Sequence, residues 1–272
     1  MSAPPGSVGT VAEPVATDPA VREVASWIRA TAKVTVLTGA GISTDSGIPD
    51  FRGPAGVWTR DPAAQRMVDI EVYANDPAVR VLAWRRRRDH EAWRAQPNAA
   101  HRALVDLERA GKLRAIVTQN IDRLHQRAGS DPDRVIELHG AMMETTCLGC
   151  RERRPMRQAL DRVEAGEPDP PCLACGGVLK SATVFFGEML EESVLLAAQR
   201  AAVDCGVFLV VGTSLMVAPA SWLPEIAAAA GARVAVINGE PTPYDQRADA
   251  VLREPIGGVL PKLIELARGS PE

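Results

Sequence analysis

This 272-residue sequence lacks the features that mark membrane and secreted proteins. No window approaches the roughly 18 consecutive apolar residues of a membrane-spanning helix. The first twenty residues contain four prolines and neither lysine nor arginine, whereas a secretory signal needs a basic start and a continuous apolar stretch. We therefore expect residues 1–20 to form a disordered tail, and the protein to be cytoplasmic with no membrane partner.

The sequence also lacks a large charge of either sign. Its net charge is −3 and its pI is near 5.9, so nothing favours nucleic acid as an electrostatic partner. Lysine occurs only four times, and the other cationic side chains are arginine apart from four histidines. Apolar residues make up 46% of the chain, which is ordinary for a globular domain.

Short apolar runs alternate with amphipathic helical patterns along the chain. The runs typical of buried strands are 34–37, 115–117, 207–211, 233–237 and 250–252. The helical patterns are 21–28, 99–110, 191–203, 219–230 and 258–267. This alternation predicts an α/β fold, with a Rossmann-like parallel sheet covered by helices on both faces.

Two regions interrupt this alternation. Residues 56–96 contain three tryptophans and a run of four arginines at 85–88, and they predict a helical insert. We interpret the arginines as a solvated helix face, with a docking patch for acidic groups as the alternative. Residues 141–182 hold paired cysteines and prolines and look too polar to build their own core. The catalytic domain is thus predicted at 21–272, its Rossmann-like part comprising 21–55, 97–140 and 183–272.

Two C-x-x-C pairs, Cys147 with Cys150 and Cys172 with Cys175, predict a metal site. Each tight turn can aim two thiolates at one ion, and four sulfur ligands complete a tetrahedral zinc site. Because no coordination position stays open, we expect the zinc to be structural and to staple the small module. The fifth cysteine, Cys205, precedes the run at 207–211 and is interpreted as a core residue.

A glycine-rich turn, TGAGISTDSGIPDFRG at 38–53, follows the first strand of the predicted sheet. Gly39 and Gly41 match the first two glycines of a dinucleotide-binding fingerprint, but Thr44 takes the place of the third. A turn that binds no ligand is the alternative. The charged and aromatic continuation, DFRG at 50–53, favours a binding site.

Polar residues also follow three further strands of the predicted sheet. They are Thr118 to Asp122, Gly212 to Ser214, and Asn238 to Glu240. Since the carboxyl ends of parallel strands meet at one edge of a sheet, these residues and the glycine turn predict a nucleotide cleft. For Asn120 and Asp122 taken alone, capping of the next helix is an equal alternative.

One of the four histidines stands at the same predicted edge. His139 follows the strand-like residues 135–138 and precedes Gly140. The pKa of an imidazole suits a general base at neutral pH, and a structural role is the alternative. His90 and His101 are interpreted as surface or capping residues, and His125 as a packing residue.

Taken together, these motifs resemble the sirtuin family of NAD-dependent protein lysine deacylases. The matching pieces are GAGISTDSGIPDFRG (39–53), TQNIDRLHQRAG (118–129), LHG (138–140), both C-x-x-C pairs, VFFGE (184–188), GTSLMVAPA (212–220) and INGEPTP (237–243). They follow the order of the family and span nearly the whole chain after the predicted tail.

The resemblance implies a role for each matching residue. His139 is the general base, and Asn120 and Asp122 belong to the catalytic site. The residues implied to bind NAD are Gly39, Ala40, Gly41 and Ile42 through their main-chain N–H groups, Asp50, Phe51 and Arg52 on a mobile loop, Gln119, Asn120, Ile121 and Asp122 around the nicotinamide and ribose, and Gly212, Thr213, Ser214, Asn238, Gly239, Glu240 and Ile256 around the adenosine. The residues implied to hold the substrate peptide as an added strand are Val184, Phe185, Phe186, Gly187 and Glu188 on one side and Leu215, Met216 and Val217 on the other.

The implied reaction consumes NAD as a co-substrate. The acyl-lysine oxygen attacks the nicotinamide ribose, nicotinamide leaves, and His139 removes a proton from a ribose hydroxyl that then attacks the captured amide. The products are free lysine, nicotinamide and O-acyl-ADP-ribose, and the zinc takes no part. The implied partners are acyl-lysine segments of proteins, and we expect a monomer.

The chain departs from the family pattern in two places. LKSAT at 179–183 stands where the family often has a proline and a charged residue. The arginines at 85–88 lack the tyrosine found in members that accept acidic acyl groups, so acetyl or another uncharged acyl group is expected. The alternatives are a mono-ADP-ribosyltransferase on the same fold and a zinc-ribbon binding module with a vestigial cleft. The intact Asn120, Asp122 and His139 argue against the latter.

Overall fold

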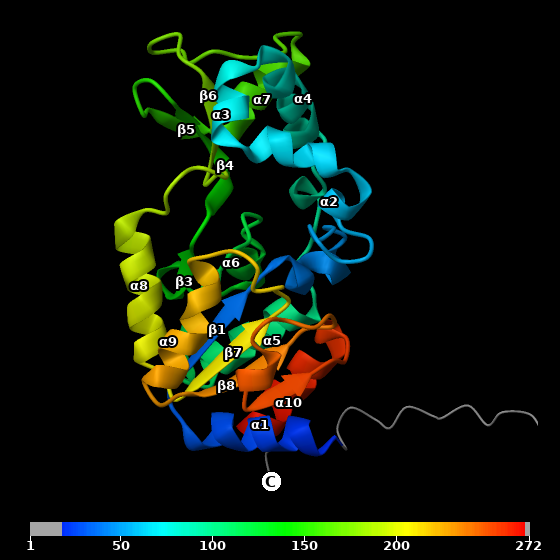
Figure 1. Cartoon of the computed structure of the whole chain (residues 1–272), viewed down its shortest axis with the longest axis vertical. Helices are drawn as coiled ribbons and strands as arrows, with labels where there is room; N and C mark the ends of the chain where they lie inside the picture. Colours follow the sequence, from blue (N-terminus) through cyan, green and yellow to red (C-terminus); the bar gives the residue numbers. More distant parts are fainter. Residues whose placement is uncertain (1–17, 270–272) are drawn as a thin grey trace, which may run out of the picture.

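A computed structural model of the chain describes residues 18–269, which form a large and a small lobe (Figure 1). The large lobe contains a six-stranded sheet of order β3-β2-β1-β7-β8-β9, and all of its strands run parallel. These strands are β1 (Val34–Thr38), β2 (Leu113–Thr118), β3 (Val135–Glu137), β7 (Val207–Val211), β8 (Arg233–Ile237) and β9 (Ala250–Leu252).

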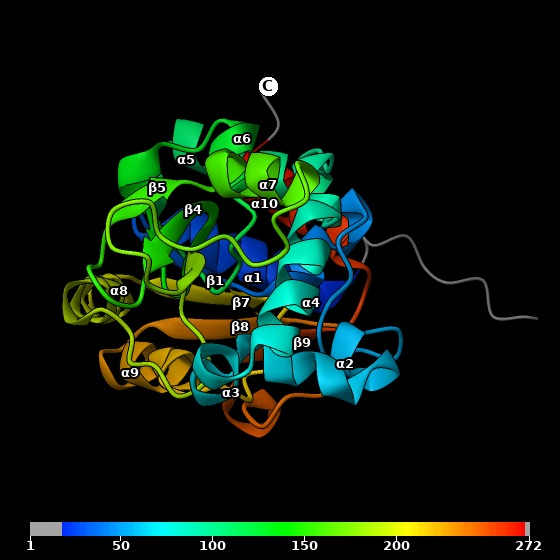
Figure 2. The ribbon, with the colours of Figure 1, turned by 90° about the horizontal axis from the view of Figure 1, so that it is seen from above.

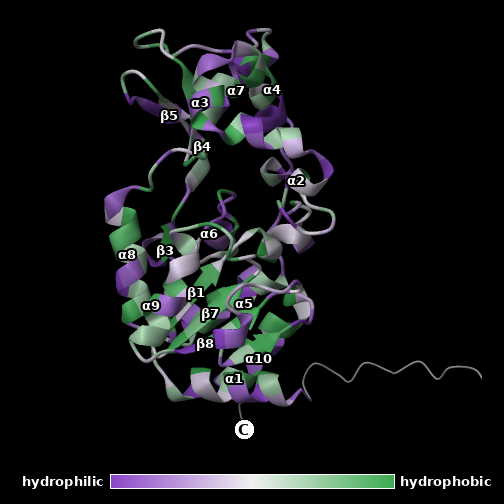
Figure 3. Ribbon diagram, viewed as in Figure 1, coloured by the Kyte–Doolittle hydropathy of each residue, from purple (hydrophilic) through white to green (hydrophobic). Residues whose placement is uncertain are grey.

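Helices cover both faces of this sheet, as the sequence predicts. One face carries α1 (Pro19–Ala30), α5 (Ala99–Arg109) and α10 (Ile256–Arg268), and the other carries α8 (Glu192–Val203) and α9 (Leu223–Ala229). Successive side chains of β7 enter the two cores in turn, with Leu209 in the first core and Phe208 and Val210 in the second. Because both faces are buried, the strands are largely apolar (Figure 3).

The amino-terminal helix α1 begins earlier than the sequence suggests. Asp18 caps it by accepting a hydrogen bond from the Ala20 N–H at 2.7 Å, and Pro19 occupies the first helical position. The predicted tail at 1–20 therefore extends two residues too far, since Pro19 and Ala20 are helical. Its residues 1–17 lie outside the described part of the chain.

The small lobe joins two regions that the sequence analysis treats as separate. The first contributes α2 (Val57–Arg60), α3 (Ile70–Asn75) and α4 (Pro77–Arg88). The second contributes α7 (Met156–Glu164) and an antiparallel sheet of β4 (Gly140–Cys147), β5 (Arg153–Pro155) and β6 (Leu179–Thr183).

One shared core holds the small lobe together. Trp84 of α4 is fully buried in a cluster with Cys147, Met156 and Leu160. The expectation that residues 141–182 build no core is therefore wrong in part, because α7, which the sequence analysis misses, supplies apolar side chains. Trp84 from the helical insert completes that core.

The order of the strands reverses between β1 and β7. From β1 the chain continues to β2 and β3 on one side, and β7 leads to β8 and β9 on the other. Sheets of this kind bind ligands at the carboxyl ends of the strands where the order reverses. Those ends point toward the small lobe, which overlies the large lobe in the view from above (Figures 1 and 2).

The longest helix of residues 18–269 is α10, with 13 residues. None of the described helices has the length and apolar character needed to cross a bilayer.

Candidate active site

The glycine turn lies at the reversal between β1 and β7. The Gly39 N–H donates to the carbonyl oxygen of Val211 at 3.0 Å, and the Gly41 N–H donates to that of Gly212 at 2.8 Å. A Cβ atom on Gly41 would lie only 2.8 Å from the Cα of Gly212, which itself has a φ of +63°. The loops after β1 and β7 can therefore touch only because both contact points lack side chains.

The hydrogen bonds of the turn show which of its N–H groups are already engaged. The resemblance implies that the N–H groups of Gly39, Ala40, Gly41 and Ile42 bind the pyrophosphate. The N–H groups of Gly39 and Gly41 already donate to carbonyl oxygens of Val211 and Gly212, and the Ile42 N–H donates to the carbonyl oxygen of Gly39 at 3.2 Å. Of the four, only the Ala40 N–H donates no hydrogen bond within the described range. The chain continues as a short 3₁₀ helix, η2 (Ala40–Ser46), and not as the long helix against which a third glycine would pack.

A serine that the sequence analysis does not single out links two of the proposed catalytic residues. The Ser43 hydroxyl donates to Oδ2 of Asp122 at 2.8 Å and lies 3.2 Å from Nδ2 of Asn120, which donates to it. Ser43 is 1% exposed and Asp122 is 5% exposed. Burial raises the pKa of the Asp122 carboxyl, and hydrogen bonds from Leu124 and Ser43 oppose that shift. Ser43 thus holds the carboxamide and the carboxylate in fixed relation.

Asn120 and Asp122 also have structural bonds of their own. The Asn120 side chain donates to the carbonyl oxygen of Gly39 at 3.1 Å, which anchors it to the glycine turn. Oδ1 of Asp122 accepts the Leu124 N–H at 2.9 Å, at the start of α6 (Leu124–Ala128). Asp122 therefore accepts the first N–H of this short helix in addition to its contact with Ser43, although Arg123 occupies the N-cap position.

His139 has the protonation state that a general base needs. Its Nδ1 lies 3.0 Å from the main-chain oxygen of Gln119, and since a carbonyl only accepts, Nδ1 carries the proton and Nε2 keeps a lone pair. Burial lowers the pKa of His139, and the bond to Gln119 partly opposes that effect. The imidazole is therefore neutral at pH 7.

Gln119, which follows β2, forms hydrogen bonds with residues at the ends of β1 and β7. Its N–H donates to the Thr38 oxygen of β1 at 2.9 Å, and its side-chain amide donates to Thr213, after β7, at 2.9 Å. The end of β7 is linked to β8 in the same way, since the Gly212 N–H donates to the carbonyl oxygen of Ile237 at 2.9 Å. The polar strand ends identified in the sequence thus lie side by side.

Two of the proposed adenosine residues, Asn238 and Glu240, lie on a loop that Arg253 holds by hydrogen bonds. Its guanidinium donates to the carbonyl oxygens of Asn238 and Glu240 at 2.7 and 2.8 Å. Ile256 begins α10, and a Cβ on the adjacent Gly257 would lie 2.2 Å from Oδ2 of Asp45 on η2. The start of α10 therefore packs against the glycine turn.

An aromatic row connects the proposed cofactor loop with the proposed peptide segment. The ring centroids of Phe51 and Trp58 are 4.7 Å apart, and those of Trp58 and Phe186 are 5.5 Å apart. Arg52 lies over the Trp58 ring at 4.4 Å, and Asp50 accepts the N–H of Gly53 at 3.0 Å. Residues implied in NAD binding and in peptide binding thus come together here.

The proposed peptide segment 184–188 is linked through the main chain to His139, the proposed general base. The Val184 N–H donates to the carbonyl oxygen of His139 at 2.9 Å. Phe186 is 40% exposed and Met216, from the facing segment 215–217, is 63% exposed, whereas Phe185 is buried. Both segments therefore offer apolar side chains to a ligand.

The four paired cysteines converge on one point in the small lobe. The Sγ atoms of Cys147, Cys150, Cys172 and Cys175 lie within 4.8 Å of one another. Two of the separations are 3.5 and 3.7 Å, close to the edge of about 3.8 Å that a tetrahedron with zinc–sulfur bonds of about 2.3 Å requires. The donor set and its spacing fit the predicted structural zinc.

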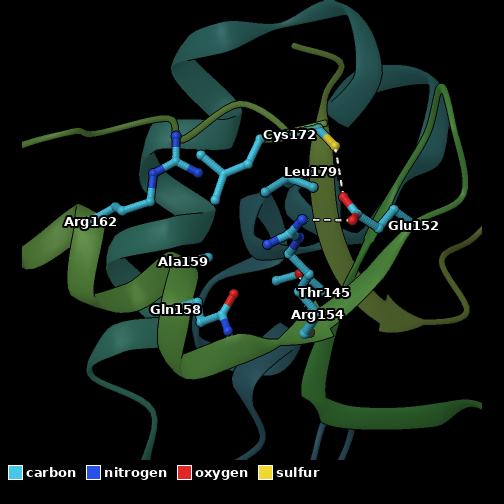
Figure 4. A pocket seen from close by; sticks show the side chains of 9 residues that line it. Thr145, Glu152, Arg154, Gln158, Ala159, Arg162, Cys172 and Leu179 are labelled. Atoms are coloured by element: carbon cyan, nitrogen blue, oxygen red, sulfur yellow. Dashed lines mark hydrogen bonds and ion pairs between the residues drawn. The ribbon is translucent and has the colours of Figure 1, made fainter. Parts of the chain in front are cut away.

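A shallow pocket lies beside this site and away from the polar strand ends (Figure 4). Oε2 of Glu152 is 3.6 Å from Sγ of Cys172, and Arg154 pairs with the other oxygen of that carboxylate at 2.7 Å. Because a carboxylate would repel a cysteine thiolate, we assign Arg154 the role of neutralising Glu152.

Comparison with known protein families agrees with the motifs found in the sequence. Residues 39–219 match the profile of the Sir2 family. The chain belongs to the Sir2 family. The predicted resemblance to the sirtuins is confirmed.

Two curated relatives align with this Sir2 family member over most of its length. NAD-dependent protein deacetylase 2 of Streptomyces coelicolor is 55% identical over 231 residues, which cover 85% of this chain and 96% of the relative. NAD-dependent protein deacetylase 1 of Pyrobaculum aerophilum is 44% identical over 254 residues, covering 91% and 94% respectively.

Solved structures share the fold of this Sir2 family member. A Sir2 enzyme with a p53 peptide and NAD⁺ superposes with a TM-score of 0.80 at 34% identity, covering 89% of this chain and 96% of that chain. Another, with a deacetylated p53 peptide and 3′-O-acetyl-ADP-ribose, gives a TM-score of 0.83 at 34% identity and covers 90% and 97%.

The other histidines of this Sir2 family member serve the fold. His90 caps a short helix by accepting the Ala92 N–H at 3.1 Å. His101 is fully buried and shares a capping box with Asn98, so the expected capping role is confirmed and the surface position is wrong. His125 packs against His101 with the ring centroids 5.0 Å apart, as its packing interpretation predicts.

Two minor expectations need correction. Within the run at 85–88, Arg87 is only partly solvated, because it donates to the Tyr73 hydroxyl at 3.2 Å and lies over the Trp84 ring at 5.1 Å. Cys205 is half-buried and not a full member of the core, with its thiol donating to Ala202 at 3.2 Å.

Proposed function

We propose that this Sir2 family member removes acetyl groups from lysine side chains of proteins and consumes NAD in doing so. The products are free lysine, nicotinamide and O-acetyl-ADP-ribose. The observation that carries this proposal is the neutral His139, with its Nε2 lone pair free, at the sheet edge where Ser43 joins Asn120 to Asp122. That arrangement suits a reaction that needs a base and a polar, water-poor pocket.

NAD supplies the ADP-ribose that accepts the acetyl group. We assign His139 the role of taking a proton from a ribose hydroxyl, since its other nitrogen is engaged with Gln119. Asn120 is 9% exposed and Asp122 is 5% exposed, so the polar groups around the reacting centre are largely withdrawn from bulk water. This withdrawal favours transfer of the acetyl group over simple hydrolysis of NAD.

We assign the substrate peptide to the space between segments 184–188 and 215–217. The N–H groups of Met216 and Val217 donate no hydrogen bond within residues 18–269, which leaves donors for an added strand. The exposed Phe186 and Met216 supply apolar contacts on the two sides.

We further propose a preference for uncharged acyl groups. An acidic acyl group needs a free cation, and Arg87 is instead committed to Tyr73 and to the surrounding rings. Arg86 pairs with Asp61, and Arg88 pairs with Asp89. Arg85 has no ion pair among the described residues, and its side chain is exposed on α4 and not packed against the rings that surround Arg87. A cytoplasmic location and a monomeric state remain our proposals, and the paired cysteines fit a reducing compartment.

Mass spectrometry of peptides incubated with the protein and NAD tests this function. We expect acetyl-lysine peptides to lose the acetyl group with stoichiometric nicotinamide and O-acetyl-ADP-ribose, and succinyl-lysine peptides to stay unchanged. A peptide or protein that gains ADP-ribose instead would identify a transferase.

His139→Ala tests the assigned base. We expect this variant to keep its fold and to lose deacetylation by about 100-fold or more, since about 100-fold is the lower end of the range for a general base. Lys262→Ala is the control, because Lys262 forms an exposed pair with Glu265 on α10, and it should keep its activity. Full activity in His139→Ala would remove the assignment.

A further inference from the structure

Lys180 is a buried cation for which the proposed reaction has no use. Its side chain is 3% exposed, although lysine is almost never fully buried unless it is paired. Its Nζ donates to the carbonyl oxygens of Ser181 and Thr183 at 3.2 and 2.6 Å and pairs with Oε2 of Glu188 at 2.9 Å. An ammonium has three N–H groups, so all of its donors are satisfied.

The fold itself gains little from such a pair. The desolvation of two charges offsets most of their attraction, and apolar replacements of similar size are often neutral or stabilising. The role of the pair is therefore inferred from its position in the fold and not from its contribution to stability.

Lys180 holds the peptide segment 184–188 from both ends. On one side it binds the oxygen of Thr183, the residue directly before the segment. On the other it pairs with Glu188, whose Oε2 also accepts the Phe185 N–H at 2.8 Å and so closes the segment into a tight turn. The ammonium lies 4.3 Å over the Phe185 ring between these two anchors.

The segment held in this way leads directly to the active site. Val184 follows Thr183 and donates to the oxygen of His139, and Phe186 contacts Trp58 of the aromatic row. A shift of the turn would therefore move the edge on which the peptide is proposed to lie.

We infer that Lys180 is a positioning residue for peptide recognition, whose ammonium fixes segment 184–188 in the shape that accepts the acetyl-lysine strand. This inference rests on the proposed function.

Three variants separate positioning from a purely structural role. Lys180→Met leaves the half-buried Glu188 carboxylate without its cation, so we expect it to lose stability and peptide affinity together. Lys180→Met with Glu188→Gln removes both charges, so we expect stability to return to that of the wild type. Peptide affinity should stay low in the double variant, because the ammonium that anchors both ends is still missing. Glu188→Gln alone keeps the bond from Lys180 to Thr183, so it should lose less peptide affinity than the double variant, and an equal loss would assign the effect to Glu188.

The measurements are chemical unfolding, the Kd of a fluorescent acetyl-lysine peptide, and the KM for NAD and for peptide. In the double variant we expect the Kd and KM for peptide to rise about 10-fold, which corresponds to about 1.4 kcal/mol, with the KM for NAD unchanged. Lys262→Met is the control, since Lys262 forms an exposed pair with Glu265 on α10, and it should match the wild type in every measurement.

Two further outcomes would overturn the inference. The first is wild-type peptide affinity in the double variant, which would make Lys180 structural only. The second is an equal rise in the KM for NAD, which would indicate general disturbance of the site. Failure of the proposed function is distinguishable, because the wild type itself would then neither bind nor deacetylate the peptide.

Discussion

At the scale of single residues, the active site depends on hydrogen bonds that a catalytic motif does not reveal. Asn120, Asp122 and His139 follow strands and stand out in the sequence. Ser43 lies within the glycine-rich stretch and resembles an ordinary turn serine. Its importance comes from burial between two strand ends, which a single sequence does not display.

Ser43→Ala tests this link. The variant leaves Oδ2 of Asp122 without the hydroxyl that donates to it, so we expect kcat/KM for NAD to fall about 10-fold or more while the fold persists. Thr44→Ala is the control, since it removes an exposed hydroxyl from the same short helix. The two variants are compared by steady-state kinetics, and equal activities would show that Ser43 has no such role.

The buried histidines give the stability of the protein a defined pH dependence. Burial lowers the pKa of His101 from 6.5 to about 4, and that of the neighbouring His125 well below its usual value. The unfolded chain therefore takes up protons first as the pH falls, so stability is full above about pH 6.5 and declines toward the folded pKa.

For His101 alone, this difference lowers the free energy of unfolding by about 2 kcal/mol between about pH 7.5 and about pH 5. Chemical unfolding at both pH values measures the change. His101→Gln cannot take up the proton, so its stability should decline less over the same range. An equal decline in the variant and the wild type would contradict the assignment.

At the scale of elements, the contact between the loops after β1 and β7 forms the base of the site. The sequence predicts a glycine-rich turn there, and the resemblance implies that its N–H groups bind NAD. In the structure, the absence of side chains is what matters, because each backbone occupies the space that a Cβ of the other would need.

Gly41→Ala tests this contact. The added Cβ would lie 2.8 Å from Gly212, so the loops must separate, and we expect a loss of about 1–3 kcal/mol together with a raised KM for NAD. Gly258→Ala is the matched control, because a Cβ there meets nothing within 4 Å inside α10. That variant should be as stable as the wild type or slightly more so, by thermal unfolding.

The elements of the large lobe could be predicted because both faces of its sheet are buried. A strand such as β7 is then apolar throughout, and the helices that cover it keep one apolar stripe. Helix α7 is missed by the sequence analysis, although Met156, Leu160 and Val163 stand at the spacing of one helix face, because residues 141–182 are interpreted there from their cysteines and prolines. Its partner Trp84 lies far away in the sequence.

At the scale of the whole molecule, the zinc site stabilises a lobe made from two distant parts of the chain. Cys147 and Cys172 belong to the same buried cluster as Trp84 of α4. Loss of zinc should therefore loosen α4 as well as the cysteine module, and with them the segment 184–188 that follows β6.

Cys172→Ser tests this dependence. We expect loss of bound zinc, and a Tm lowered by roughly 10 °C if several kcal/mol are lost. Cys205→Ser should keep both, since Cys205 lies outside the four-cysteine group. Metal analysis and thermal unfolding provide the readouts, and a zinc-free Cys172→Ser protein with an unchanged Tm would contradict the structural role.

The sequence by itself determined the α/β class, the zinc ligands and the polar residues at the strand ends. These follow from local periodicity, from cysteine spacing and from the chemistry of residues next to one another in the chain. Only the tertiary structure decided that Ser43 joins Asn120 to Asp122, that the glycines serve a contact between loops, and that Trp84 and Lys180 support distant segments. Each of those facts depends on which side chains and backbone groups are buried against one another. That is determined only when elements from distant parts of the chain pack together.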